Sequence, residues 1–150
     1  MTPAFENGGN LCYGEDKTFT ITVNPTAQVD KPTDQVVCNG DTTSIVEFTT
    51  QIAGGASTYT WTNDTPSIGL SDSGSGDILA FTATNSSTAQ IVAAITVTPT
   101  FENGGNLCDG EDKTFTITVN PTAQVDKPVD QVICNGEDVS VVFTLSLIHI

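Results

Sequence analysis

The chain contains a tandem repeat, and this duplication constrains its fold more than any other feature. Residues 2–40 reappear as residues 98–136, an offset of 96 residues. The copies differ only at Ala4/Thr100, Tyr13/Asp109, Thr33/Val129 and Val37/Ile133. Solenoid repeats have periods of about 20–50 residues, whereas an independent domain has about 50–250. The sequence therefore predicts an array of separate domains.

The boundaries between repeats are predicted at an Asn-Pro-Thr-Ala-Gln stretch, which occurs at residues 24–28 and again at 120–124. One complete module then spans residues 26–121. Residues 1–25 are interpreted as the C-terminal part of a preceding repeat, and residues 122–144 as the N-terminal part of a following one. Because a few strands cannot bury both faces alone, we expect these two parts to fray or to pair with each other in a second, permuted sandwich.

The last six residues, 145–150, read Leu-Ser-Leu-Ile-His-Ile. They match one reading frame of a widely used transposase sequencing adapter, and we interpret them as a non-native tail; an ordinary apolar strand end is the alternative. The only histidine, His149, lies in this tail. We therefore assign it to no metal or catalytic site.

Composition narrows the class of protein. The chain is 37% hydrophobic and 15% charged, which is typical of a folded domain. Its 18 acidic residues against 4 basic ones, all lysine, give a net charge of −14. Such a chain repels a phosphate backbone, so nucleic acid is excluded as a partner. No apolar run approaches the length that a membrane-spanning helix needs, so membrane insertion is not expected.

The four cysteines share one local frame, Cys-x-Gly-[Asp/Glu], at Cys12, Cys38, Cys108 and Cys134. No Cys-x-x-Cys pair occurs, which argues against structural zinc and thioredoxin-like redox chemistry. Two cysteines per module favour an oxidising, extracellular setting. We predict a disulfide between Cys38 and Cys108, worth about 4 kcal/mol in the chain-entropy model. It requires Cα atoms within about 7 Å.

Short runs with a period of two predict an all-β fold. The expected strands are residues 18–23, 35–38, 44–50, 58–62, 78–84, 90–98 and 114–119. Gly-, Ser- and Asn-rich turn clusters separate them. Their number and spacing favour an immunoglobulin-like Greek-key β-sandwich. The expected core residues are Trp61, Tyr59, Phe81, Phe115, Ile117 and Val119.

Several motifs, in this order and spacing, resemble a known family. They are Cys-Asn-Gly-Asp at 38–41, Tyr-Thr-Trp-Thr-Asn at 59–63, Ile-Gly-Leu at 68–70, Ser-Gly-Ser-Gly-Asp-Ile at 73–78, Phe-Thr-Ala-Thr-Asn at 81–85 and Ile-Thr-Val-Thr-Pro at 95–99. Together they are similar to the PKD-like, Ig-fold repeats of large secreted and surface proteins of gliding and related Gram-negative bacteria. The resemblance implies a β-sandwich at the cell surface or outside the cell, a role in adhesion or display, and no shared catalytic residues.

The sequence offers no convincing catalytic or metal site. With His149 set aside, a hydrolytic triad lacks its base. Loop carboxylates could bind calcium, which needs six to eight oxygen ligands, and Glu111 and Asp112 are the best of these weak candidates; solvated turns are the alternative. The sequons at residues 63–65 and 85–87 receive little weight as glycosylation sites.

Two function hypotheses remain. The first is a non-catalytic structural or adhesive repeat of a secreted or surface-anchored bacterial protein, with neighbouring repeats and surface glycans or proteins as its partners and no cofactor. The second is an accessory carbohydrate-binding domain of a secreted enzyme, which needs exposed aromatic side chains on one face. Because Tyr13 becomes Asp109 in the second copy, an aromatic platform at that loop is not maintained between repeats. This difference favours the first hypothesis.

Overall fold

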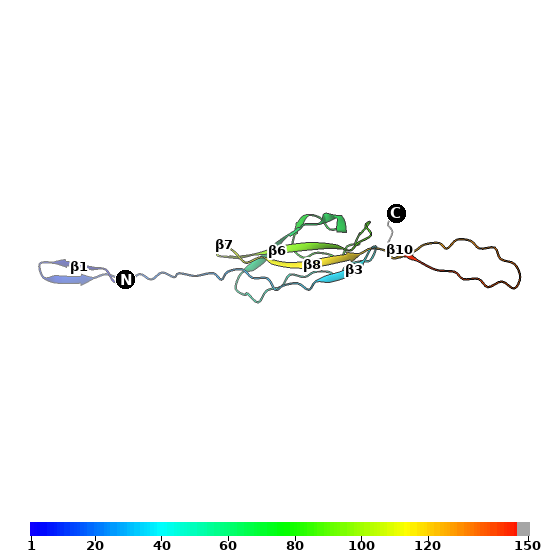
Figure 1. The fold of residues 1–150 in the computed structure, drawn as a ribbon. Helices are drawn as coiled ribbons and strands as arrows, with labels where there is room; N and C mark the ends of the chain where they lie inside the picture. The colour runs from blue at the N-terminus through cyan, green and yellow to red at the C-terminus, as the bar shows by residue number, and fades with distance from the viewer. Residues whose placement is uncertain (147–150) are drawn as a thin grey trace.

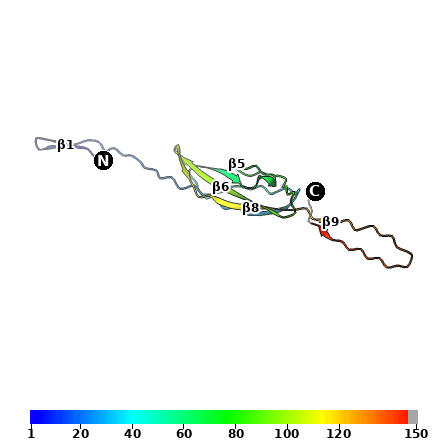
Figure 2. The same cartoon turned by 45° about the horizontal axis from the view of Figure 1, so that its top comes forward.

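A computed structural model describes residues 1–146 of the chain. These residues form a mainly β structure, with one 3-10 turn, η1 (Pro66–Ile68), and no α-helix among them. The molecule is elongated: a central body carries a hairpin on an extended arm at one end and a long loop at the other (Figure 1). The same arrangement is visible after rotation (Figure 2). The predicted all-β class is thus confirmed at the level of a mainly β fold.

The central body is built on one mixed six-stranded sheet. Its strands are β3 (Gln35–Cys38), β4 (Ala56–Asn63), β5 (Ser73–Ser75), β6 (Ile91–Asn103), β7 (Asn106–Asp109) and β8 (Lys113–Asn120). The order is β3-β8-β6-β4-β5, and β7 pairs with the end of β6. The β3–β8 pair is parallel and the other pairs are antiparallel. The 13-residue strand β6 is therefore the centre of the sheet.

Alternation along the strands buries one face of the sheet. In β8, Phe115, Ile117 and Val119 are 1%, 0% and 0% exposed, while the threonines between them lie on the other face. In β6, Ile95 and Val97 are fully buried in the same way. Threonine and β-branched side chains suit a half-buried strand. The sequence pattern is thus sufficient to explain which face of these strands forms the core.

Two extended segments, residues 42–48 and 78–84, supply the other side of the core. Val46, Phe48 and Ile78 are at most 7% exposed and join the same hydrophobic cluster as Trp61 and the buried residues of β6 and β8. Regular strands were predicted at residues 44–50 and 78–84, but the structure holds only two isolated bridges between the two segments.

The irregular pairing has a visible cause, because side chains replace backbone groups as partners. The Phe48 amide donates to the Asp77 carboxylate at 2.9 Å, and the Phe81 amide donates to the Thr43 hydroxyl at 3.1 Å. A backbone donor that bonds to a side chain is not available for a regular ladder. Such side-chain partners could not be read from hydrophobic periodicity.

Strand β5 was not predicted, because its Ser-Gly-Ser sequence is typical of a turn. It pairs with β4, and Gly74 lies opposite Trp61. A Cβ at Gly74 would collide with the indole ring. A residue without a side chain is therefore needed where the Trp61 ring crosses this strand.

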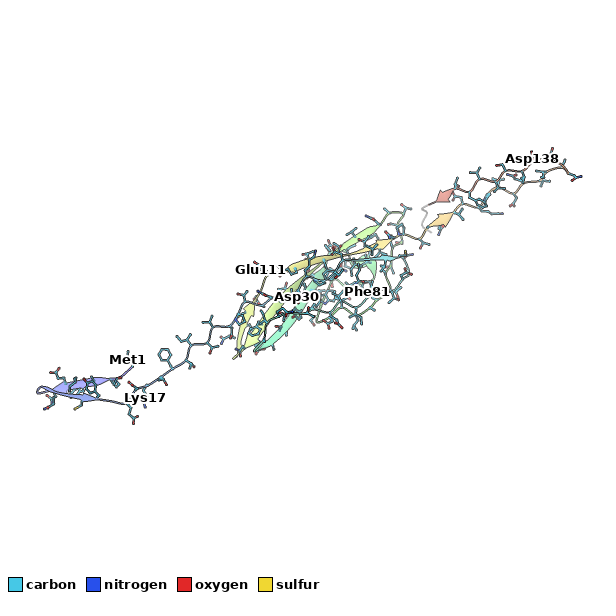
Figure 3. The ribbon with its side chains drawn as sticks, turned by 90° about the horizontal axis from the view of Figure 1, so that it is seen from below. Met1, Lys17, Asp30, Phe81, Glu111 and Asp138 are labelled. Atoms are coloured by element: carbon cyan, nitrogen blue, oxygen red, sulfur yellow. The ribbon has the colours of Figure 1, made fainter. Side chains whose placement is uncertain are left out.

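The two flanking regions lie at opposite ends of the central body (Figure 1). The first forms a hairpin, β1 (Ala4–Asn7) with β2 (Asn10–Tyr13), and the second is closed by a short pair, β9 (Gln124–Val125) with β10 (Leu145–Ser146). Figure 3 shows Met1 and Lys17 at the base of the hairpin and Asp138 near the tip of the distant loop. Within residues 1–146 the two flanks do not pair with each other, so of the two expected outcomes, fraying or a permuted sandwich, the permuted sandwich is not formed. The flanks cannot reach each other, because the central body lies between the hairpin at one end and the long loop at the other (Figure 1).

Candidate functional site

Each end of the central module carries side-chain hydrogen bonds to the linker that enters or leaves it. At the first end, the segment that enters the module is held by a reciprocal pair of amides. The Asn24 side chain donates to the Asn103 carbonyl oxygen at 3.0 Å, and the Asn103 side chain donates to the Asn24 side-chain oxygen at 3.0 Å. The hairpin formed by β6 and β7 therefore binds the linker that precedes the module.

Apolar contacts continue this attachment along the next residues. Ala27 and Val29 are 1% and 4% exposed. Gly110, just after β7, lies so close to Ala27 that a Cβ there would collide with the Ala27 carbonyl group. The Gly110 amide donates to the Pro99 carbonyl at 3.0 Å, which keeps this turn against β6. Residues 24–29 thus lie firmly on the end of the sheet.

At the opposite end, Asn39 binds the segment that leaves the module. Its backbone amide donates to the Asn120 carbonyl oxygen at 2.9 Å, and its side chain donates to the Thr122 hydroxyl at 3.0 Å. The Asn39 side-chain oxygen also accepts a hydrogen bond from the backbone N–H of Asn85 at 2.7 Å. All polar groups of the Asn39 side chain therefore connect the exit linker to the body of the module.

Sequence reasoning missed Asn39, Asn103 and Thr122 as contact residues. The sequence contained one indirect indication of these contacts, because the Asn-Pro-Thr linker is the same at both module boundaries. A repeated boundary suggests a repeated contact, but it does not say which residues of the module make that contact. These residues can be identified only from the structure, which gives the register of β6 with β7 and the position of the Asn39 turn.

The asparagines of the two sequon-like triplets, Asn63 and Asn85, have buried side chains with a structural role. They are 5% and 3% exposed. Asn63 donates to the carbonyls of Leu70 and Ser71, and Asn85 donates to those of Ala89 and Val119. A side-chain nitrogen with two internal partners has no free donor. In the folded chain these residues satisfy buried backbone groups rather than present a glycan.

Among the carboxylates of residues 1–146, Asp64 alone has a pKa that departs clearly from its usual value. It accepts hydrogen bonds from the Ala94 amide and the Thr65 hydroxyl, each at 2.8 Å. These bonds, the backbone one first, favour the charged form and lower the pKa below 3.8. A carboxyl with a lowered pKa in the folded state contributes stability above its unfolded pKa and loses it as the pH falls through its folded pKa.

Replacing Asp64 with asparagine is therefore expected to flatten the acid end of the stability profile. In the parent chain, Asp64 should contribute stability at pH values above 3.8 and lose that contribution as the pH falls below 3.8, and the Asn variant should lack this part of the acid-induced fall in the free energy of unfolding. Chemical denaturation at several pH values measures both profiles. Parallel profiles for the two proteins would contradict the assignment.

Tyr59 is the other residue in the described part of the chain with a shifted pKa. Its burial against the core raises the pKa above 10.0, the Asp30 and Asp77 carboxylates add to this rise, and a hydrogen bond with Ser57 opposes it. The ring contacts Phe48, with centroids 5.6 Å apart. Tyr59 and Phe81 are partly buried and pack on the core cluster.

All four cysteines are free thiols in the structure. Cys38 ends β3 beside the last residues of β8, whereas Cys108 lies opposite Phe101 on β6. The end of β8 is paired with Ile91, ten residues before Phe101 along β6, which corresponds to about 33 Å. The predicted Cys38–Cys108 bridge is not made, because the two residues lie at opposite ends of the sheet.

The free thiols lead to a simple expectation. The denaturation midpoint should be the same with and without a reductant, because no cross-link constrains the unfolded chain. Cys12, Cys38 and Cys134 are exposed, so a thiol reagent should label them without unfolding the protein. A midpoint that falls on reduction, together with thiols that stay unreactive, would contradict this expectation.

The weak calcium candidates do not converge on one position. Glu111 forms an ion pair with Lys113 at 3.6 Å, and Asp112 accepts a hydrogen bond from the Thr98 hydroxyl at 2.7 Å. Glu111 lies on the same part of the central body as Asp30 (Figure 3), and both line a groove with residues 26–29. Among residues 1–146, no cluster of three or more potential metal-ligating side chains is found. His149 lies outside the described residues.

Trp61 contributes mainly to the core. It is 8% exposed, and its indole nitrogen donates to the Gly76 carbonyl at 3.1 Å. The remaining exposed edge lines a shallow recess, whose other residues are Thr60, Thr62, Ser73, Gly74 and Thr98. A ring in this position offers little surface for stacking on a sugar.

Comparisons of the chain with protein-family models, curated proteins and solved structures found no match. The resemblance to PKD-like repeats therefore stays a prediction from the motifs. Within the described residues, no helix has the length and apolar character required to cross a membrane.

Proposed function

We propose that this chain is a non-catalytic structural repeat protein, part of a secreted or surface-anchored bacterial protein that extends or presents an adhesive region. One observation carries the proposal: the module occurs in a near-identical tandem repeat, and its entry and exit linkers lie at opposite ends of an elongated body (Figure 2). Copies joined in this way extend in a line. A linear array is suited to a spacer or a stalk.

For the fold of the repeat we propose an immunoglobulin-like β-sandwich of the PKD-like kind. The six-stranded sheet would form one layer, and residues 42–48 and 78–84 would form the second, irregular layer. Their shared hydrophobic cluster and the antiparallel bridges between the two segments support this arrangement. The parallel β3–β8 edge next to antiparallel strands also fits it.

The charge of the chain supports an exposed, extended role. A net charge of −14 keeps copies soluble and discourages contacts between the sides of neighbouring arrays. The threonine-rich solvent face of β4, β6 and β8 adds polar surface without charge. In this reading the acidic residues are distributed for solubility rather than gathered for catalysis.

The proposal can be tested on the full chain with a glycan array and a panel of hydrolase substrates, with and without calcium. The expected result is no turnover and no saturable sugar binding by the module. Reproducible turnover that disappears on replacing one loop carboxylate would overturn the proposal.

The same experiment tests the accessory carbohydrate-binding hypothesis. Thr60→Arg places a long side chain over the recess beside Trp61, while Thr58→Arg changes the same solvent face away from it. Saturable sugar binding that is lost in Thr60→Arg and kept in Thr58→Arg would favour an accessory domain. Both positions are exposed, so neither variant should unfold the core.

A further inference from the structure

We infer that each Asn-Pro-Thr linker binds both modules that it joins, so that consecutive copies are held in one fixed orientation. The partner surface at each end of the module is therefore the adjacent copy of the same module. This inference rests on the proposed function, because it concerns how repeats follow one another in an array. It adds a specific contact where loosely linked domains would be the default expectation.

The entry linker shows the contact with the module that follows. Only the side chain of Asn24 is used there, in its reciprocal pair with Asn103. The backbone carbonyl of Asn24 and the hydroxyl of Thr26 make no hydrogen bond to any residue within 1–146. Both groups remain available to another partner.

The exit linker shows the contact with the module that precedes. Here the groups in use are the Asn120 carbonyl and the Thr122 hydroxyl, both bound by Asn39. The side chain of Asn120 has no hydrogen-bond partner among the described residues. The groups that are free at one linker are thus the groups that are used at the other.

Because residues 24–28 and 120–124 have the same sequence, both sets of contacts can apply to one linker between two complete copies. The four hydrogen bonds share no donor hydrogen and no acceptor atom. The proline between them restricts the backbone to one region of φ. A single linker can therefore satisfy both modules at once.

Burial differences support the same arrangement. Ala27 and Val29 are buried against the module that they enter, whereas their copies Ala123 and Val125 are exposed, Val125 by 59%. A complete following module would bury the second pair as the first pair is buried. Its β6–β7 hairpin would then lie beside the Asn39 turn of the preceding copy.

The test uses the full chain carrying a second copy of residues 29–124 directly after Gln124, so that residues 120–124 join two complete modules. Residual dipolar couplings report the alignment of each module. The inference predicts one shared alignment tensor for both. Two independent tensors would overturn it.

Two variants identify the contacts. Asn120→Ala removes the amide pair with Asn103 of the second copy, and Thr122→Val removes the acceptor for Asn39; each is expected to abolish the shared tensor. Neither side chain is buried in the first module, so both modules should stay folded. Asn106→Ala in the second copy is the control, since this exposed side chain bonds only to Gly104 of its own turn.

A shared tensor that survives both linker substitutions would also overturn the inference, because the orientation would then have another cause. Two independent alignment tensors in the unsubstituted two-module chain would overturn the inference on module orientation but would not contradict the proposed function. Turnover or sugar binding in the assays above would contradict that function without any change in module orientation. The two failures are therefore distinguishable.

Discussion

Phe115→Ala is expected to destabilise the chain by about 3–5 kcal/mol, whereas Phe19→Ala should change the free energy of unfolding by less than about 0.5 kcal/mol. The two phenylalanines stand in identical hexapeptides, residues 114–119 and 18–23. Phe115 is 1% exposed within the core, and Phe19 is 84% exposed on the arm before the module. Removing the first ring leaves a cavity, while removing the second leaves none.

Urea denaturation followed by fluorescence provides the measurement. Trp61 is the only tryptophan and lies in the core, so its emission reports on the central module. Single domains are stable by about 5–15 kcal/mol, and the Phe115 variant should lose a large share of this. An unchanged denaturant slope confirms that the stability has changed rather than the size of the unfolding unit. Equal losses for both variants would contradict the structure.

Gly110→Ala is expected to produce the second-largest loss, about 1–3 kcal/mol or more. The added Cβ would meet the backbone of Ala27 and would lie 2.9 Å from Pro99 Cγ. Backbone cannot move aside as a flexible side chain can. The linker segment would have to leave the end of the sheet, exposing Ala27 and Val29.

Gly14 is the matched control, because it is the copy of Gly110 in the first repeat. A Cβ there would contact Pro3 alone, at 2.9 Å from its Cγ, and this exposed hairpin has room to adjust. Gly14→Ala should therefore change stability by less than about 0.5 kcal/mol. Hydrogen exchange of the Asp30 amide, which donates to the Thr49 carbonyl at 2.8 Å, should accelerate in the Gly110 variant alone. Unchanged exchange in that variant would show that the linker is not held by this contact.

Periodicity predicted the positions of the main strands well. Strands expected at residues 35–38, 58–62, 90–98 and 114–119 correspond to β3, β4, β6 and β8. Alternation works there because one face of each strand is more buried than the other. It did not predict β5, whose Ser-Gly-Ser sequence carries no apolar signal. It also predicted regular strands at 44–50 and 78–84, where side-chain acceptors interrupt the ladder.

The candidate site was less accessible to sequence reasoning. The linker was located correctly as a repeated boundary, but its partners Asn39 and Asn103 are distant in sequence and carry no distinctive motif. The cysteine frame suggested a bridge that the sheet does not allow, because equal numbers of cysteines per module say nothing about which end of the sheet each one occupies.

The duplicated segments separate what the sequence alone determines from what tertiary structure decides. The hairpins β1–β2 and β6–β7 have the same register, with Gly8 and Gly104 at φ 62° and Gly9 and Gly105 at φ 77°. A two-residue turn with both glycines at positive φ is a local property, so it forms wherever the sequence occurs.

The identical hexapeptides 18–23 and 114–119 behave differently. The second is a fully paired strand between β3 and β6, and the first forms no strand and exposes its apolar side chains. A strand obtains its hydrogen bonds and its burial from neighbours that are distant in sequence. Its pattern of residues determines which face can be buried, and only the presence of those neighbours decides whether it is.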